Sequence, residues 1–263
     1  MQLDPVALRA GVRLEPHDAV GSTNAEALTC ARNGTLGPLW ITAVRQSAGR
    51  GRHGRTWTSE PGNLYATLLL TDPAPAEWAA QLSFVAALAV HDAVVERAPA
   101  LAGRLALKWP NDVLADGAKV AGILLESESA TDHTISVAVG IGVNCTRHPD
   151  GTTFPATDLA AAGAPVTPAA LFATLSRTML SRLTQWDRGR NFAAIRGDWL
   201  ARASGVGEPI RVALPDRDLE GRFETLDAAG HLMLRTGDGR VIAVAAGDVF
   251  PLDQPAASAA WSA

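Results

Sequence analysis

The stretch GRGRHGRTWTSEPGN, residues 49–63, decides between two fold classes. Its first three glycines satisfy the G-x-G-x-x-G spacing of a dinucleotide-binding turn, and the stretch follows an expected strand at residues 39–46. That motif requires a helix that begins at the third glycine, because the helix N-terminus receives the pyrophosphate. A proline–glycine pair at residues 61–62 follows instead, so no helix is expected. The pattern therefore argues against a doubly wound dinucleotide-binding sheet.

The sequence around this stretch alternates between helical and strand patterns without a strict repeat. Helices are expected from a cap at Ser22 or Thr23 and over residues 77–98, 167–186 and 192–200, where apolar side chains recur at helical spacing. β-Branched and apolar runs predict strands at residues 39–46, 63–70, 104–109, 119–129 and 133–144, the last two as an antiparallel pair joined by ATD. We therefore expect an α+β domain with a mixed sheet.

A second pattern begins near ASGVGEP, residues 203–209. Four short strand-like runs follow, IRVAL, LEGRFETLD, HLMLRT and VIAVAAGDV, separated by turn residues. Such spacing is typical of a small β-barrel. We therefore expect a catalytic domain over residues 1–204, a small C-terminal β-barrel over 205–253 and a disordered tail over 254–263, in which Trp261 has no evident role.

Composition excludes several classes of protein. The net charge of −4 and a pI near 5.9 argue against a general nucleic-acid binder. No uninterrupted apolar run approaches the roughly 18–20 residues that a membrane span needs, and no secretory signal is evident at the start. The two cysteines, Cys30 and Cys145, lie far apart, so a disulfide or zinc site is not expected. The cytoplasm is the expected compartment, without membrane association.

Positive charge is concentrated in the glycine-rich stretch. Residues 27–59 contain no acidic residue, and five arginines lie among them: Arg32, Arg45, Arg50, Arg52 and Arg55. Guanidinium groups pair with phosphate or carboxylate oxygens in a bidentate manner, and glycines let the backbone approach a ligand. A solvated basic loop and an RNA-binding loop are the alternatives, although Trp57 is the only stacking side chain in the stretch.

Lysine is rare in this chain. Of the 23 basic residues only two are lysines, Lys108 in LKWPND and Lys119 in AKVAGILLE. A general preference for arginine explains the ratio, but a compact ammonium is hard to replace where a point charge must act. Both lysines are therefore candidates for a functional site.

Five motifs in this order, GSTN (21–24), RQSAGRGRHGRTW (45–57), KWPND (108–112), KVAGILLE (119–126) and GIGVN (140–144), resemble the biotin protein ligase family. The resemblance covers residues 17–253. It implies a mixed-sheet catalytic domain related to class II aminoacyl-tRNA synthetases and a small SH3-like C-terminal barrel. It also implies a ligase that converts biotin and ATP to biotinoyl-5′-AMP and then acylates a lysine of a biotin carboxyl carrier protein.

The resemblance also implies which residues form the site. Biotin contacts fall on the residues Ser22, Thr23, Asn24, Gln46, Gly49, Arg50, Gly51, Arg52 and Lys119. ATP contacts fall on the residues Arg52, Arg55, Trp57, Lys108, Asn111 and Asn144. The catalytic assignments are Lys119, which would bridge the biotin carboxylate and the α-phosphate, and Arg50 and Arg52, which would close over the intermediate. Asp112 would help to hold Mg²⁺.

Short polar side chains suit the ureido ring of biotin, which has one carbonyl acceptor and two N–H donors. For Ser22 and Thr23 the alternative is helix capping alone, and for Asn111 and Asp112 it is a turn after Pro110. Gly140 and Gly142 are expected to leave room for the nucleotide.

The family also sets limits on partners. Only about twenty residues precede GSTN, too few for a three-helix DNA-reading module, so no operator binding is expected. The carrier would be a subunit of acetyl-CoA carboxylase or a related carboxylase, and a homodimer stays open. A lipoate or octanoate ligase or transferase is the nearest alternative, and the arginine–glycine loop with KWPND favours the biotin branch.

Overall fold

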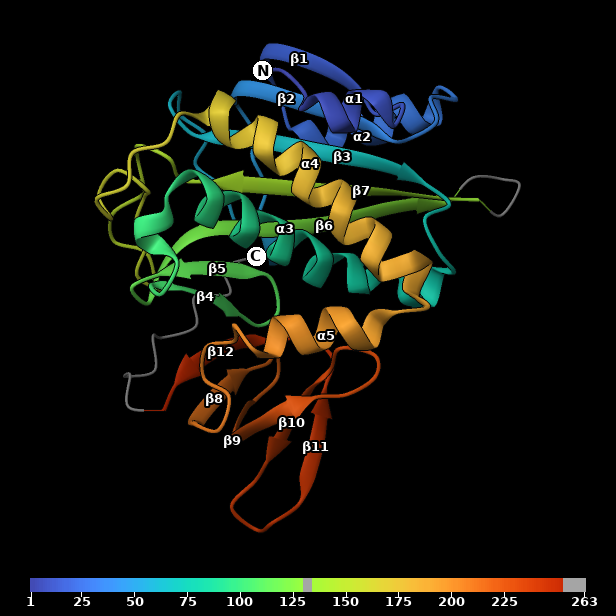
Figure 1. Cartoon of the computed structure of the whole chain (residues 1–263). Helices are drawn as coiled ribbons and strands as arrows, with labels where there is room; N and C mark the ends of the chain where they lie inside the picture. Colours follow the sequence, from blue (N-terminus) through green and yellow to red (C-terminus); the bar gives the residue numbers. More distant parts are fainter. Residues whose placement is uncertain (130–133, 253–263) are drawn as a thin grey trace.

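The computed structural model describes residues 1–129 and 134–252 and contains two β-sheets in that part of the chain (Figure 1). The expected ATD turn and the tail with Trp261 lie outside the described residues. The large sheet has seven strands in the order β1-β2-β3-β7-β6-β5-β4. Its strands are β1 Arg13–Val20, β2 Leu39–Gln46, β3 Leu64–Thr71, β4 Leu105–Lys108, β5 Asp112–Ala115, β6 Ala118–Ser129 and β7 Ile135–Val143. Because β1 and β2 are parallel and the other pairs antiparallel, the expected mixed sheet is confirmed.

Helices cover both faces of this sheet. The helices are α1 Pro5–Arg9, α2 Thr23–Arg32, α3 Leu82–Arg97, α4 Pro168–Trp186 and α5 Phe192–Leu200. Alternation along β3 separates the faces, since Leu68 joins the core beneath α3 and α4 whereas Leu69 packs with Ala27 of α2. Figure 1 shows α3 and α4 crossing one face of the sheet, with α2 beyond it.

The C-terminal unit is a five-stranded antiparallel sheet in the order β11-β10-β9-β8-β12. Its strands are β8 Pro209–Ala213, β9 Asp218–Leu226, β10 Leu232–Arg235, β11 Val241–Val244 and β12 Asp248–Pro251. The prediction of a single strand over VIAVAAGDV is wrong. The run divides at Gly247, whose φ of 159° suits glycine. Its two halves form β11 and β12, which lie at opposite edges of the sheet. The Trp109 indole, which is 2% exposed, donates to the carbonyl of Gly230 at 3.1 Å and links this unit to KWPND.

Three elements were not expected from the sequence. The edge strand β1 contains Pro16 and exposed polar side chains, so it lacks an apolar alternation. Proline is tolerated at an edge, where its missing N–H leaves no internal ladder bond broken. The short β5 places Asp112 at its first residue rather than in a turn. The five-residue helix α1 is the third.

One segment, Ala76–Arg97, is long and apolar enough to cross a membrane by length and composition, which the inspection of uninterrupted runs did not anticipate. In this fold 67% of its apolar window is buried, and α3 packs between the sheet and α4. A core helix of a folded domain has this environment.

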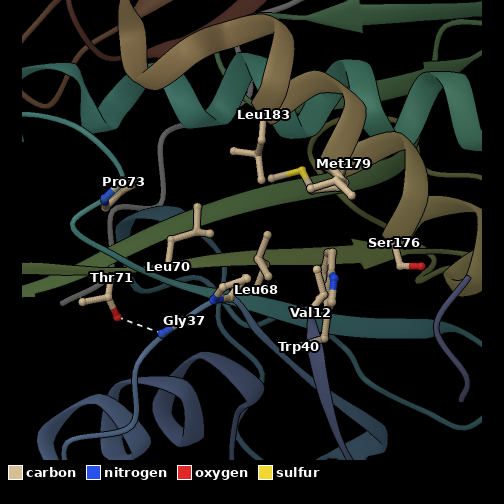
Figure 2. Close-up of a pocket in the computed structure, with 12 residues that line it drawn as sticks. Val12, Gly37, Trp40, Leu68, Leu70, Thr71, Pro73, Ser176, Met179 and Leu183 are labelled. Atoms are coloured by element: carbon tan, nitrogen blue, oxygen red, sulfur yellow. Dashed lines mark hydrogen bonds between the residues drawn. The ribbon is translucent and has the colours of Figure 1, made fainter. Parts of the chain in front are cut away.

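A cavity of about 150 Å³ lies on the α4 face of the sheet (Figure 2). Figure 2 shows Trp40 and Leu68 of the sheet opposite Met179 of α4, so its walls are largely apolar. The polar and charged residues singled out from the sequence lie elsewhere, which separates this cavity from the candidate site.

Candidate active site

Residues 49–57, here called the arginine flap, fold as a narrow ribbon. The backbone N–H of Trp57 donates to the carbonyl of Gly49 at 2.9 Å, and Arg50 pairs with Thr56 in an antiparallel bridge. The tip is a single 3₁₀ turn at Arg52–Gly54, which reverses the chain through left-handed backbone. The flap thus presents its arginines at the tip and along one edge.

Carboxylates from two distant elements hold these arginines. Arg52 Nη1 lies 3.5 Å from Asp248 Oδ1 of β12 and donates to the carbonyl of Gly247 at 3.2 Å. Arg55 forms an ion pair with the other oxygen of Asp248. Burial lowers the pKa of Arg52 below its ordinary value, because desolvation outweighs the attraction of Asp248. Arg50 Nη2 lies 3.0 Å from a carboxylate oxygen of Glu126 on β6.

The Trp57 ring covers a floor of glycines on β6 and β7. A Cβ on Gly142 would lie 2.5 Å from the indole and collide with it, and one on Gly122 would lie 3.0 Å from it, a tight contact. The Lys119 ammonium lies 5.4 Å from the centroid of the same ring. The indole N–H is buried and has no hydrogen-bond partner among residues 1–129 and 134–252, so it can donate to a ligand.

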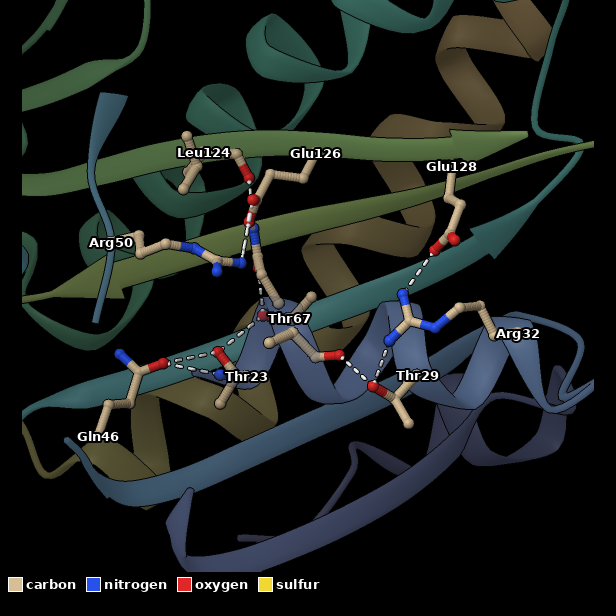
Figure 3. Close-up of polar contacts among 11 residues, drawn as sticks. Thr23, Thr29, Arg32, Gln46, Arg50, Thr67, Leu124, Glu126 and Glu128 are labelled. Carbon is tan, nitrogen blue, oxygen red and sulfur yellow. Dashed lines mark hydrogen bonds and ion pairs between the residues drawn. The ribbon is translucent and has the colours of Figure 1, made fainter. Parts of the chain in front are cut away.

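A cluster of neutral polar side chains lies beside this floor (Figure 3). Gln46 Oε1 accepts from the Thr23 backbone N–H at 2.8 Å and lies 3.1 Å from the Thr23 hydroxyl. Thr67 Oγ1 lies 2.8 Å from Thr23 Oγ1 and 2.6 Å from Asn24 Oδ1. Asn24 Nδ2 donates to Glu126 Oε2 at 2.8 Å. Figure 3 shows Gln46 of β2 meeting Thr23 of α2, and Arg50 reaching Glu126 of β6.

Ser22 occupies the N-cap position of α2 but does not cap it with its side chain. Ser22 is 5% exposed, and its hydroxyl has no hydrogen bond in the described part of the chain. Capping alone therefore does not explain Ser22. Gly49 lies against Trp57 and Ser59, where a Cβ would collide with the Trp57 carbonyl. Gln46 Nε2 donates to Ser59 Oγ at 2.9 Å, which fixes the amide orientation.

Both lysines of the chain lie beside Asp112. Lys119 Nζ lies 2.6 Å from Asp112 Oδ1, and the register of β4 and β5 places Lys108 opposite Asp112. Burial is the largest cause that lowers the pKa of Lys108, and the Lys119 charge lowers it further, whereas Asp112 opposes the shift. The three groups form a compact charged centre between the flap and the C-terminal sheet.

The two asparagines of the ATP assignment make structural contacts. Asn111 Nδ2 donates to the carbonyl of Ile123 at 2.7 Å, and its Oδ1 lies 3.4 Å from Arg52 Nη1. Asn144 Nδ2 donates to the carbonyl of Thr157 at 3.0 Å. Gly140 lies beneath Asn24 and Gly142 beneath Trp57, so both glycines make room for protein side chains in this structure.

A metal centre made by the protein alone is not present among the described residues: no group of three His, Cys, Asp or Glu side chains is placed to hold an ion. Asp112 is one carboxylate at the charged centre, with Lys119 on one of its oxygens. This single carboxylate suits Mg²⁺ only if phosphate oxygens and water complete the coordination of the ion, as is usual for Mg²⁺ at nucleotide sites.

The fold therefore brings the predicted residues into one region, on and beside the α2 face between β2 and β12. Sequence reasoning missed several residues whose side chains contact them, among them Ser59, Thr67, Glu126, Phe154, Asp248 and Phe250. The hydroxyl of Thr67 in the apolar run LYATLLL was a usable signal. Glu126 ends the motif KVAGILLE, but its pairing with Arg50, 76 residues away, has no local signal; neither has the pairing of Asp248 with Arg55, 193 residues away.

Comparisons with known proteins relate this chain to biotin ligases. A model of the biotin/lipoate A/B protein ligase family matches residues 28–144, and a model of the biotin protein ligase C-terminal domain matches residues 205–250. A biotin–[acetyl-CoA-carboxylase] ligase of Paracoccus denitrificans is 46% identical over 235 residues, which cover 87% of this chain and 96% of that protein. A ligase of the same name from Mycobacterium tuberculosis is 36% identical over 237 residues, which cover 88% of this chain and 86% of that one.

The fold is also similar to that of a solved structure, the biotin protein ligase of Aquifex aeolicus in complex with biotin and ATP. The TM-score is 0.74 at 26% identity, and the match covers 90% of this chain and 97% of that one. The order of the five motifs, the two matched domains and the identity to full-length relatives all agree. The chain therefore belongs to the biotin protein ligase family.

Proposed function

We propose that this protein is a biotin–[biotin carboxyl carrier protein] ligase. It uses ATP to convert biotin to biotinoyl-5′-AMP and transfers the biotinoyl group to a lysine of a carboxylase carrier domain. The observation that carries the proposal is the position of Lys119, whose ammonium lies 2.6 Å from Asp112 Oδ1 and 5.4 Å from the centroid of Trp57 in the arginine flap. The family membership identifies the reaction, and the side chains of the site give physical reasons why this chain can perform it.

Biotin is proposed to bind over the glycine floor, with its ureido ring against Ser22, Thr23, Asn24 and Gln46. The cluster offers hydroxyl and amide groups of both polarities, which suit a neutral ring with one acceptor and two donors. The ring would compete with Trp57 for the surface of Gly142. The carboxyl end of biotin would then point toward Lys119.

In the first step a biotin carboxylate oxygen attacks the α-phosphorus of ATP, and the bond to pyrophosphate breaks. Two anions must approach each other, so Lys119 is proposed to leave Asp112 and lie between them, where its charge is worth most in the transition state. In the second step the neutral amine of the carrier lysine attacks the acyl carbon, an amide forms, and AMP leaves.

Arg50, Arg52 and Arg55 are proposed to close over the phosphates and exclude water from the mixed anhydride. Gly51 lies between Arg50 and Arg52 in the chain, so its backbone is part of the same closure. Trp57, Lys108, Asn111 and Asn144 are proposed to contact ATP. Asp112 would help hold Mg²⁺, which supplies charge neutralisation on the phosphate oxygens. Asn144 has its Oδ1 and one Nδ2 hydrogen to offer, because Nδ2 donates its other hydrogen to the Thr157 carbonyl.

The remaining assignments are proposed on the same basis. Residues 1–204 form the catalytic domain, of the class II aminoacyl-tRNA synthetase type, and residues 205–253 form an SH3-like barrel. The two outer strands of the C-terminal sheet, β11 and β12, do not pair with each other in the described residues. Both cysteines are free thiols, which suits the cytoplasm. Biotin, ATP and the carrier are the partners, and a homodimer is compatible with the site.

Biotin-dependent exchange of pyrophosphate into ATP tests this function against the lipoate alternative. We expect exchange with biotin and at least about 100-fold less with lipoate or octanoate, because buried polar groups of the site would lose their partners. Transfer to an apo carrier domain, read by avidin blot, should follow. Exchange with a fatty acid alone would overturn the assignment, and salt-sensitive RNA retention without a biotin requirement would point to the RNA-binding alternative.

Glu126→Gln should weaken biotin binding. Glu126 Oε2 accepts from both Asn24 and Arg50, and a glutamine removes the negative charge that pairs with the Arg50 guanidinium. We expect the Kd for biotin, measured by titration calorimetry, to rise about 10-fold, the size of one lost charge-assisted hydrogen bond. Glu128→Gln is the matched control, since Glu128 lies two residues further along β6 and pairs with Arg32 at 2.8 Å. That control should change the Kd by less than about twofold; equal effects in both variants would contradict the role of Glu126.

A further inference from the structure

The Lys108 ammonium lies between two phenylalanine rings. Its Nζ is 3.9 Å from the centroid of Phe154 and 5.7 Å from the centroid of Phe250. Phe154 belongs to the connection between β7 and α4, and Phe250 belongs to β12 of the C-terminal sheet. Two segments that are remote in sequence therefore meet at one of the two lysines of the chain.

Each ring is held by its own anchor. The segment after Phe154 runs beside β6: Lys119 donates from its backbone N–H to the Pro155 carbonyl at 2.7 Å, and the Thr157 N–H donates back to Lys119 at 2.9 Å. This bridge makes the position of Phe154 depend on the backbone of Lys119. The backbone that follows Phe154 is therefore held beside β6.

Phe250 is fixed by alternation along β12. Val249 is 7% exposed and belongs to the core, so Asp248 and Phe250 share the opposite face of the strand. Asp248 pairs with the flap arginines, and Phe250 lies over Lys108. Arg211, its neighbour on β8, has its guanidinium carbon 5.3 Å from the Phe250 centroid and braces the ring from β8.

Lys108 differs from Lys119 in what holds it. Within residues 1–129 and 134–252, Lys119 is paired with Asp112, whereas no ion pair joins Lys108 to a carboxylate. An aromatic face attracts a cation through its quadrupole and does not neutralise its charge as a carboxylate would. Lys108 is thus kept in place as a desolvated cation whose charge stays available to an anion.

We propose that Phe154 and Phe250 are positioning residues that hold the Lys108 ammonium toward the phosphates of ATP. The C-terminal sheet then supplies part of the ATP site through Phe250, in addition to the ion pairs of Asp248. This inference rests on the proposed function and extends it to two residues outside the five motifs.

Steady-state exchange kinetics on the full chain test the proposal. Phe250→Leu keeps an apolar side chain but removes the aromatic face, and it should raise the KM for ATP about 3- to 10-fold, the range of a partly desolvated cation–π contact. The KM for biotin should change by less than about twofold. Phe250→Tyr, which keeps the ring, should restore the KM for ATP. Leu252→Ala is the matched control, because Leu252 follows β12 and is 43% exposed.

A double-variant cycle separates positioning from structural support. In a Lys108→Ala background, Phe250→Leu should raise the KM for ATP by less than about twofold, because its effect acts through the ammonium. The same factor in both backgrounds, or equal increases in both KM values, would overturn the proposal. Should Phe250→Leu fail to fold, Phe154→Leu in the same cycle carries the test. Absence of biotin-dependent exchange in the unsubstituted protein would instead refute the proposed function.

Discussion

Lys119→Ala is expected to lower the rate of adenylate formation by about 10²- to 10³-fold or more, the cost of losing one preorganised charge at developing negative charge. The ammonium lies 2.6 Å from Asp112 and 5.4 Å from the Trp57 centroid, at the junction of the two proposed ligands. Removing it leaves the carboxylate and the α-phosphate to approach without a cation between them. Single-turnover formation of biotinoyl-AMP from biotin and ATP measures this directly.

The same experiment needs a test of folding and of charge. The thermal midpoint should stay close to that of the parent protein, because Lys108 also faces Asp112 and compensates its charge. Lys119→Arg keeps the charge but spreads it over a planar fork, and it should recover only part of the rate. Near-normal single-turnover formation in Lys119→Ala would remove this lysine from the chemistry.

Arg52→Gly is expected to release the intermediate. Arg52 holds the flap tip against β12 through Asp248 and the Gly247 carbonyl, and it also lies beside Asn111. Losing one charge-assisted contact of about 1.5–3 kcal/mol corresponds to escape that is about 10- to 100-fold faster. Free biotinoyl-AMP should accumulate in a filtration assay, and bystander proteins with exposed lysines should become labelled.

A charge-matched control separates the flap from general electrostatics. Arg217→Gly removes a guanidinium whose side chain is 65% exposed in the β8–β9 turn, and it should leave both readouts unchanged. Asp248→Asn removes the negative charge that pairs with Arg52, and it should release less free biotinoyl-AMP than Arg52→Gly. Unchanged carrier selectivity in Arg52→Gly would contradict a shielding role for the flap.

Elements with a strong local pattern were predicted well from the sequence. The run LWITAVRQ gave β2 at the expected residues, and the apolar stripe from Leu171 to Trp186 gave α4. The antiparallel pairing of β6 and β7 was also confirmed. In these cases burial and local propensity favour the same structure, which is the condition under which sequence patterns are informative.

Elements whose structure depends on distant partners were missed. The edge strand β1 is set by its parallel pairing with β2, because its own residues alternate weakly and include Pro16. The division of the last β run into β11 and β12 depends on which neighbours each half finds, β10 and β8. A sequence window contains neither partner.

The site shows the same division. Ser22, Gln46, Arg52 and Lys119 belong to motifs, so their types and spacing point to a ligand. Asp248 and Phe250 lie outside the motifs, and Glu126 ends the motif KVAGILLE without a predicted role; all three act through contacts that the fold creates. The family relationship supports the reaction, and the individual roles of the site residues stay predictions that the variants above would test.

The contacts of Arg52 with Gly247 and Asp248 have a consequence for how the chain folds during synthesis. Arg52 and Gly247 are separated by 195 residues in the chain. During synthesis the arginine flap therefore emerges from the ribosome long before Gly247 and Asp248. The flap stays without this anchor until β12 has been made and has paired with β8.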